Sequence, residues 1–119
     1  MNFIKGQECY ITINPWTREG TECRQYFETQ GMLNEILDKD MYYVYIRKAV
    51  VEKVGQKFYT VRYQYSPDGG YWCTGIKINK EEPFYEKEKQ FCCLSLTYEE
   101  ASNKLIEVFN KDGDINVWQ

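Results

Sequence analysis

The run Ser-Pro-Asp-Gly-Gly at 66–70 is the strongest turn signal in the chain, and it limits how the middle of the sequence can fold. Proline fixes φ and the glycines accept positive φ, so the backbone is expected to reverse direction here. Segments rich in Tyr, Val and Ile lie on both sides of this turn. A second turn, at 54–57, divides the segment before it into two strands. The pattern therefore predicts an antiparallel meander within about 42–78, with strands at 42–54, 58–65 and 71–78.

Two further strands are predicted outside the meander. Alternating apolar and polar residues indicate a strand over 8–14, and the run 91–96 is typical of a buried strand. A loop is expected over 15–20. Residues 22–29 fit either a strand or a helix, and their Tyr, Phe and Thr content favours the strand.

Two segments carry apolar residues at helical spacing. The stripe in the first predicts a short helix at about 32–39, and the stripe in the second predicts a longer helix at about 98–111. Thr97 and Glu100 form a capping box at the start of the second helix. The fold class is therefore expected to be α+β, a single small domain over 1–119, with a mostly antiparallel sheet and one or two helices on one face.

Composition excludes several kinds of chemistry. Histidine is absent, so the commonest general base and the commonest metal ligand are both missing. The five cysteines include no C-x-x-C pair, and buried reduced thiols that pack as small hydrophobes are the expected state. No apolar run approaches the ~20 residues of a membrane-spanning helix, and no export signal is recognisable. We therefore expect a cytoplasmic protein that uses no metal, no cofactor and no membrane.

Charge is distributed unevenly along the chain. The net charge is −3, yet residues 41–80 carry seven Lys or Arg against two Asp or Glu. Both flanking thirds are acidic. The predicted meander therefore contains both a local excess of positive charge and many aromatic rings.

The strand period of two sorts the meander into two faces. One face is mainly aliphatic and aromatic and is expected to meet the helices; Trp72 is assigned to it as a core residue. The other combines rings with cations, a combination found in protein interfaces and in surfaces that stack bases and hold phosphates. It is the candidate binding site, with six candidate residues: Tyr43, Tyr45, Arg47, Arg62, Tyr71 and Lys77.

These features lead to a functional expectation. We expect a small cytosolic, non-catalytic binding protein that acts as an inhibitor or adaptor by docking on a larger protein. Small acidic inhibitors encoded by mobile elements or phages share this size and composition, which is an analogy of profile alone. The alternative is a binder of single-stranded nucleic acid or of a nucleotide through the same face. An enzyme is not expected, because its base would have to be a strongly shifted carboxylate, Lys or Tyr.

Overall fold

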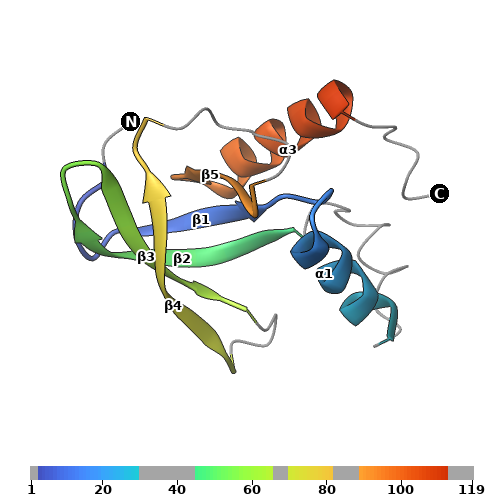
Figure 1. Cartoon of the computed structure of the whole chain (residues 1–119), viewed down its shortest axis with the longest axis horizontal. Coiled ribbons are helices and arrows are strands. Elements are labelled where there is room, and N and C mark those ends of the chain that lie inside the picture. The colour runs from blue at the N-terminus through green and yellow to red at the C-terminus, as the bar shows by residue number, and fades with distance from the viewer. Residues whose placement is uncertain (1–2, 30–44, 66–69, 82–88, 113–119) are drawn as a thin grey trace.

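A computed structural model describes residues 3–29, 45–65, 70–81 and 89–112 (Figure 1). The described elements are five strands and two helices: β1 (Glu8–Ile13), α1 (Arg18–Thr29), β2 (Ile46–Val54), β3 (Phe58–Gln64), β4 (Trp72–Asn79), β5 (Phe91–Ser95) and α3 (Tyr98–Asp112). The strands form one sheet in the order β4-β3-β2-β1-β5, and every neighbouring pair is antiparallel. The predicted α+β class and the three-strand meander are therefore confirmed. The helix predicted at about 32–39 lies outside the described residues.

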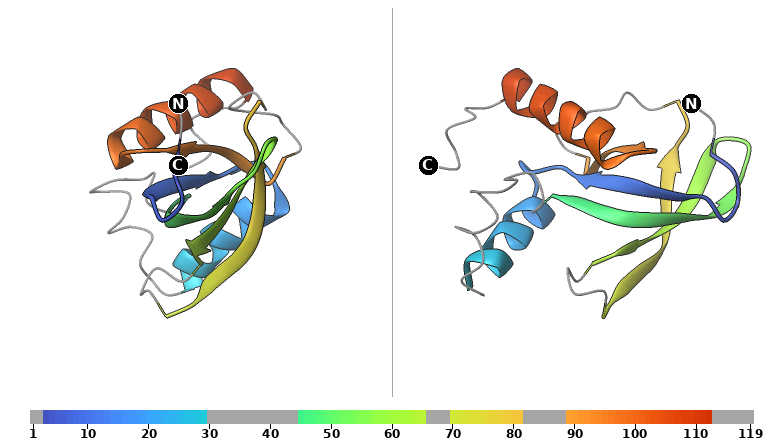
Figure 2. Two further views of the ribbon diagram at one scale, coloured as in Figure 1. Left: turned by 90° about the vertical axis from the view of Figure 1, so that its left-hand side faces the viewer. Right: turned by 180° about the vertical axis from the view of Figure 1, so that it is seen from behind.

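The sheet curls around one of its own faces, here called the inner face (Figure 2). Cross-strand pairing places Cys9 opposite Ala49, and Ala49 opposite Tyr63, so these side chains share the inner face. The curl brings the Tyr63 ring of β3 within 5.4 Å of the Phe91 ring of β5, although two strands separate β3 from β5 in the sheet. The inner face is thus largely closed by the sheet's own side chains.

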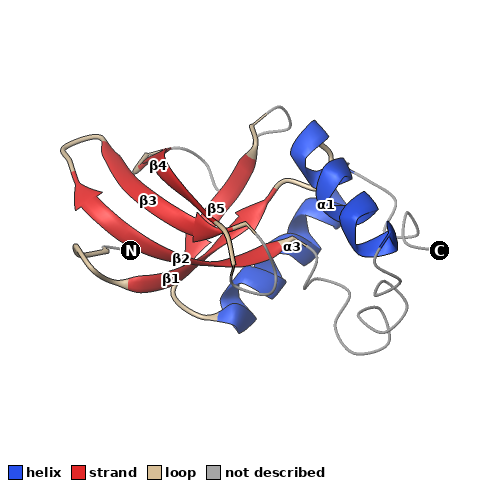
Figure 3. Ribbon diagram, turned by 90° about the horizontal axis from the view of Figure 1, so that it is seen from below, coloured by secondary structure: helices blue, strands red, loops and turns tan. Residues whose placement is uncertain are grey.

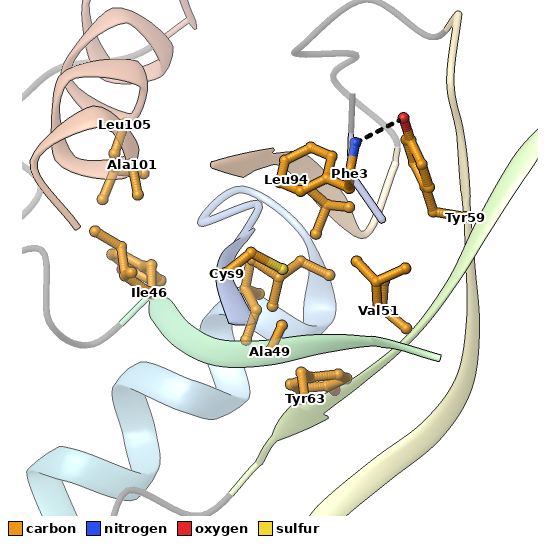
Figure 4. Close-up of a cluster of buried hydrophobic side chains, with 14 residues drawn as sticks. Phe3, Cys9, Ile46, Ala49, Val51, Tyr59, Tyr63, Leu94, Ala101 and Leu105 are labelled. Carbon is orange, nitrogen blue, oxygen red and sulfur yellow. Dashed lines mark hydrogen bonds between the residues drawn. The ribbon is translucent and has the colours of Figure 1, made fainter. Parts of the chain in front are cut away.

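An N-terminal aromatic residue helps to close the same interior. Phe3 is buried against Tyr59 in an edge-to-face contact, with 5.4 Å between the ring centroids. The backbone N–H of Phe3 donates to the Tyr59 hydroxyl, which satisfies that buried polar group (Figure 4). Phe3, although it precedes β1, therefore belongs to the core.

Helix α3 covers part of the opposite, outer face. Its Ala101 and Leu105 lie toward Ile46 at the start of β2 (Figure 4), and its Tyr98 ring contacts Tyr10 of β1 edge-to-face. Val108 packs against Cys93 of β5. The helix begins as predicted, because the Glu100 N–H donates to the Thr97 hydroxyl at 3.1 Å. The outer face is therefore covered over β5 and β1.

The strand favoured for 22–29 is wrong: these residues continue helix α1, which begins earlier, at Arg18, within the segment expected to be a loop. The cause is a turn at the end of β1. The Asn14 side chain accepts from the Trp16 N–H, and the Thr17 hydroxyl caps the new helix by accepting from the Gly20 N–H. The helix lies at the end of the sheet where β1 finishes and β2 starts (Figure 1, Figure 3).

Asn14 holds this end of the sheet together. It is fully buried, its side-chain amide donates to the Lys89 carbonyl at 2.9 Å, and its backbone N–H donates to the Gln90 carbonyl at 2.8 Å. One asparagine therefore joins the end of β1, the start of α1 and the segment that enters β5. Each of its side-chain polar groups has a hydrogen-bond partner, as burial requires.

Candidate functional site

The outer face of β2, β3 and β4 carries the positive charge that the sequence concentrates in this region. Val50 lies opposite Arg62, Lys53 opposite Thr60, and Thr60 opposite Lys77, so these side chains share the outer face. Their strand neighbours Ala49, Val51, Val61 and Tyr63 are buried on the inner face. We call the following surface the open face: Lys48, Val50, Lys53, Phe58, Thr60, Arg62, Gln64, Trp72 and Lys77.

Cations and exposed rings stand side by side on the open face. Its four cations, Lys48, Lys53, Arg62 and Lys77, are all exposed. The Arg62 guanidinium lies 5.6 Å from the centre of the Trp72 ring, a cation–π contact. Trp72 is 37% exposed and Phe58 is 40% exposed. Such a surface attracts an anionic partner and offers flat rings for close packing.

Few carboxylates oppose this charge. Glu8 on β1 borders the open face beside Val50, on the side away from Arg62. Glu52 occupies the irregular position of β2, where the register with β3 shifts between Val51 and Lys53. Within the described parts of β2, β3 and β4, Glu52 is the only acidic residue. The local charge is thus positive although the whole chain is acidic.

Three of the six predicted site residues are exposed. Arg62 and Lys77 lie on the open face, as the sequence indicated. Tyr71 is 60% exposed just before β4, and its ring contacts Tyr65 edge-to-face, with 5.8 Å between the centroids. Tyr71 therefore lies at the end of the β3–β4 ladder, beside Gln64 and Trp72.

The predicted grouping of Tyr45 and Arg47 with these residues is wrong. Tyr45 is 2% exposed and Arg47 is 5% exposed. Arg47 begins the inner stripe that continues through Ala49 and Val51, and its guanidinium donates to the carbonyls of Tyr65 and Ile46. Hydrogen bonds to backbone carbonyls allow the charged group to be buried, so its charge did not mark the solvent face. Tyr43 lies outside the described residues.

Trp72 is the residue of the open face that sequence reasoning placed on the core face. The register between β3 and β4 shifts between Val61 and Tyr63, so two residues of β4, Thr74 and Gly75, lie opposite Arg62. This bulge reverses the alternation and turns Trp72 to the side opposite Ile76. Gly75 has φ of 72°, and an isolated glycine inside a strand pattern is the one signal that indicated the bulge.

Two of the described thiols, Cys9 and Cys93, are poorly suited to catalysis. Burial raises the pKa of Cys9 to about 11, and burial also raises the pKa of Cys93. The thiolate is the nucleophilic form, so both side chains remain protonated and pack as small apolar groups near neutral pH. The described ranges contain no cluster of three or more cysteine or carboxylate side chains able to hold a metal ion.

We expect Cys9 to resist alkylation at pH 8 while the half-buried Cys73 reacts. Iodoacetamide labelling of the native protein, followed by peptide mapping, measures the two sites together. In guanidinium chloride the two thiols are expected to react at similar rates, because burial no longer protects Cys9. Rapid labelling of Cys9 in the folded protein would contradict its position in the core.

The same thiol makes stability fall at high pH. The folded state holds the Cys9 proton more tightly than the unfolded state, whose thiol has the ordinary value of 9.0. Stability is therefore lost as pH rises from about 9 toward 11, by up to about 3 kcal/mol. Urea unfolding at pH 8 and pH 10.5 measures the loss, and a Cys9→Ala variant is expected to show a smaller difference between the two pH values.

Within the described segments, neither helix is long and apolar enough to cross a membrane. No protein-family model, no curated protein and no solved structure matches this chain.

Proposed function

We propose that this chain is a non-catalytic binding protein that docks through the open face on an acidic surface of a larger protein, as an inhibitor or adaptor in the cytoplasm. The observation that carries the proposal is the arrangement of Lys48, Lys53, Arg62 and Lys77 around the exposed Trp72 on a sheet surface that no described helix covers. Arg and Trp dominate the binding energy of many protein interfaces, and cations accelerate association with acidic partners.

The way in which the two faces of the sheet are covered supports a docking role for the open face. Core-forming side chains occupy the inner face, and α3 occupies the outer face over β1 and β5. The remaining outer surface, over β2, β3 and β4, is the part of the sheet left to contact a partner. Rigid strands hold its side chains in place, which lowers the entropy lost when a partner is bound.

A second candidate function is the binding of single-stranded nucleic acid. The observation that favours it is the Arg62–Trp72 contact with Phe58 on the same face, since exposed rings beside cations can stack bases and neutralise phosphates. The net charge of −3 disfavours non-specific binding to a polyanion, so the protein partner is preferred.

Charge reversal on the open face tests the proposal. A triple variant, Lys48→Glu/Arg62→Glu/Lys77→Glu, is compared with a control triple that changes the same charge elsewhere, Lys5→Glu/Arg18→Glu/Lys89→Glu. A partner is captured from the source lysate with the wild-type protein, identified, and titrated with all three proteins. We expect the open-face triple to lose roughly 100-fold in affinity, about 3 kcal/mol, and the control to lose less than about threefold.

The outcomes separate the two candidate functions. Equal partner affinity for the open-face triple and the wild type, with matching thermal melts, would exclude the open face as the docking surface. A fluorescent dT20 oligonucleotide is titrated in parallel at several salt concentrations. Tight binding that weakens steeply with salt and disappears in the open-face triple would replace the protein partner by nucleic acid.

A further inference from the structure

Strand β4 forms one edge of the sheet. Among the described residues it pairs on one side only, with β3, while its other side has no strand neighbour. The second half of β4, Ile76 to Asn79, pairs regularly with Val61 to Phe58 of β3. This half presents a row of regularly spaced backbone groups, the template on which another strand can pair.

The inner side of this edge is apolar and incompletely covered. Ile76 and Ile78 point to the inner face beside Val61 and Tyr59, and both isoleucines are only half-buried, whereas Val61 and Tyr59 are buried. An added strand with apolar residues at alternate positions would cover Ile76 and Ile78 and extend the core by one strand.

The outer side of the same edge is cationic. Lys77 lies between the two isoleucines and points to the open face, where it is exposed beside Thr60. A second copy of β4 pairing antiparallel around this position would place Lys77 against Lys77, which like-charge repulsion disfavours. A strand with acidic residues at alternate positions would instead pair a carboxylate with Lys77.

The bulge limits where such a strand can pair. Thr74 and Gly75 interrupt the regular ladder, and Gly75 has positive φ. Regular pairing is therefore confined to the four residues after the bulge, and Lys77 is the cation within them. Bulges and edge lysines also suppress indiscriminate strand pairing, so a partner must supply matching charge.

We propose that β4 receives an extended segment of the partner protein, in which acidic and aliphatic residues alternate, as an additional strand along Ile76–Asn79. This inference rests on the proposed function and specifies how the acidic partner engages the border of the open face. Backbone hydrogen bonds supply affinity, Lys77 reads the acidic side of the segment, and Ile76 and Ile78 read its aliphatic side.

The probe is a blocked ten-residue peptide of alternating Glu and Val, titrated against the whole chain at about 150 mM salt. Three peptide controls accompany it: a peptide of the same composition with Glu and Val in separate blocks, an alternating Lys and Val peptide, and the alternating Glu and Val peptide with N-methyl groups on every second amide. We expect the unmodified peptide to bind at least tenfold more tightly than each control. Bound peptide is also expected to slow amide hydrogen exchange within Ile76–Asn79.

A charge swap identifies the residue involved. Lys77→Glu is expected to lose at least tenfold in affinity for the Glu and Val peptide and to gain affinity for the Lys and Val peptide. Lys5→Glu is the matched control, since Lys5 is an exposed lysine before β1 and lies outside both β4 and the open face. We expect it to bind the Glu and Val peptide within about threefold of the wild type.

The opposite results overturn the inference without deciding the proposed function. Equal binding of the N-methylated and unmodified peptides, or equal losses in Lys5→Glu and Lys77→Glu, would mean that the acidic peptide binds through general charge attraction without pairing to β4. Absence of any peptide binding would also reject strand addition. The proposed function fails separately, when the open-face triple variant retains the captured partner.

Discussion

Replacement of Leu105 by alanine is expected to lower the free energy of unfolding by about 3–4 kcal/mol. Leu105 lies on α3 and is fully buried between this helix and the sheet, in the cluster that also holds Ala101 and Ile46. Truncation leaves a cavity between helix and sheet that rigid neighbours fill only partly, so the cost exceeds the lost transfer free energy. Urea unfolding followed by circular dichroism measures the loss.

The control for this prediction lies on the same helix. Asn103→Ala changes an exposed residue two positions away and is expected to alter stability by less than about 0.5 kcal/mol. A loss below about 1 kcal/mol for Leu105→Ala would show that α3 does not pack on the outer face of β1 and β5 as described. In that case α3 would not divide the outer face of the sheet into a covered part, over β1 and β5, and the open face.

Gly20→Ala is expected to destabilise the protein by about 2–3 kcal/mol, although alanine favours helix formation by about 1 kcal/mol over glycine. A β-carbon on Gly20 would overlap the Asn14 carbonyl oxygen and lie 2.6 Å from the Pro15 Cα. Both obstacles are backbone, so relief requires movement of the turn that starts α1. Thermal and urea unfolding measure the loss.

The sign of this effect is the decisive feature. If helix propensity governed the site, Gly20→Ala would stabilise the protein, and that result would contradict the close approach of α1 to the end of β1. Thr21→Ala serves as the control, because Thr21 is exposed on the next position of the same helix. We expect its effect to stay within about 0.5 kcal/mol.

The open face could be predicted from the sequence only in part. Arg62 and Lys77 were found because β3 and the second half of β4 alternate regularly. Lys48 and Trp72 were not predicted to lie on the open face. For Trp72 the reason is the bulge at Gly75, and for Lys48 the reason is that alternation along β2 does not show which of its two sides faces the interior. Alternation groups residues by face but does not say which face is buried.

Arg47 illustrates the difference between a pattern and an environment. A charged residue among tyrosines indicates a solvent-exposed strand face, and that interpretation was wrong for β2. The Tyr65 carbonyl that accepts from Arg47 lies 18 residues further along the chain, on the neighbouring strand's extension. The pairing of Ala49 with Tyr63, continued by two residues, brings this carbonyl beside Arg47, and the hydrogen bond makes burial of the charge tolerable.

Local signals in the sequence determined the kinds of element and most of their positions. The Thr97 cap and the apolar stripe specify α3, and the Tyr-, Val- and Ile-rich runs around two turns specify the meander, because these preferences act within a few residues. The helix at 18–29 also starts at a local cap, Thr17, which the strand interpretation of 22–29 overlooked. Tertiary structure decided that Arg47 is buried and that Trp72 is exposed. Both depend on contacts between strands: a curled interior for Arg47 and, for Trp72, a bulge that reverses the alternation of β4.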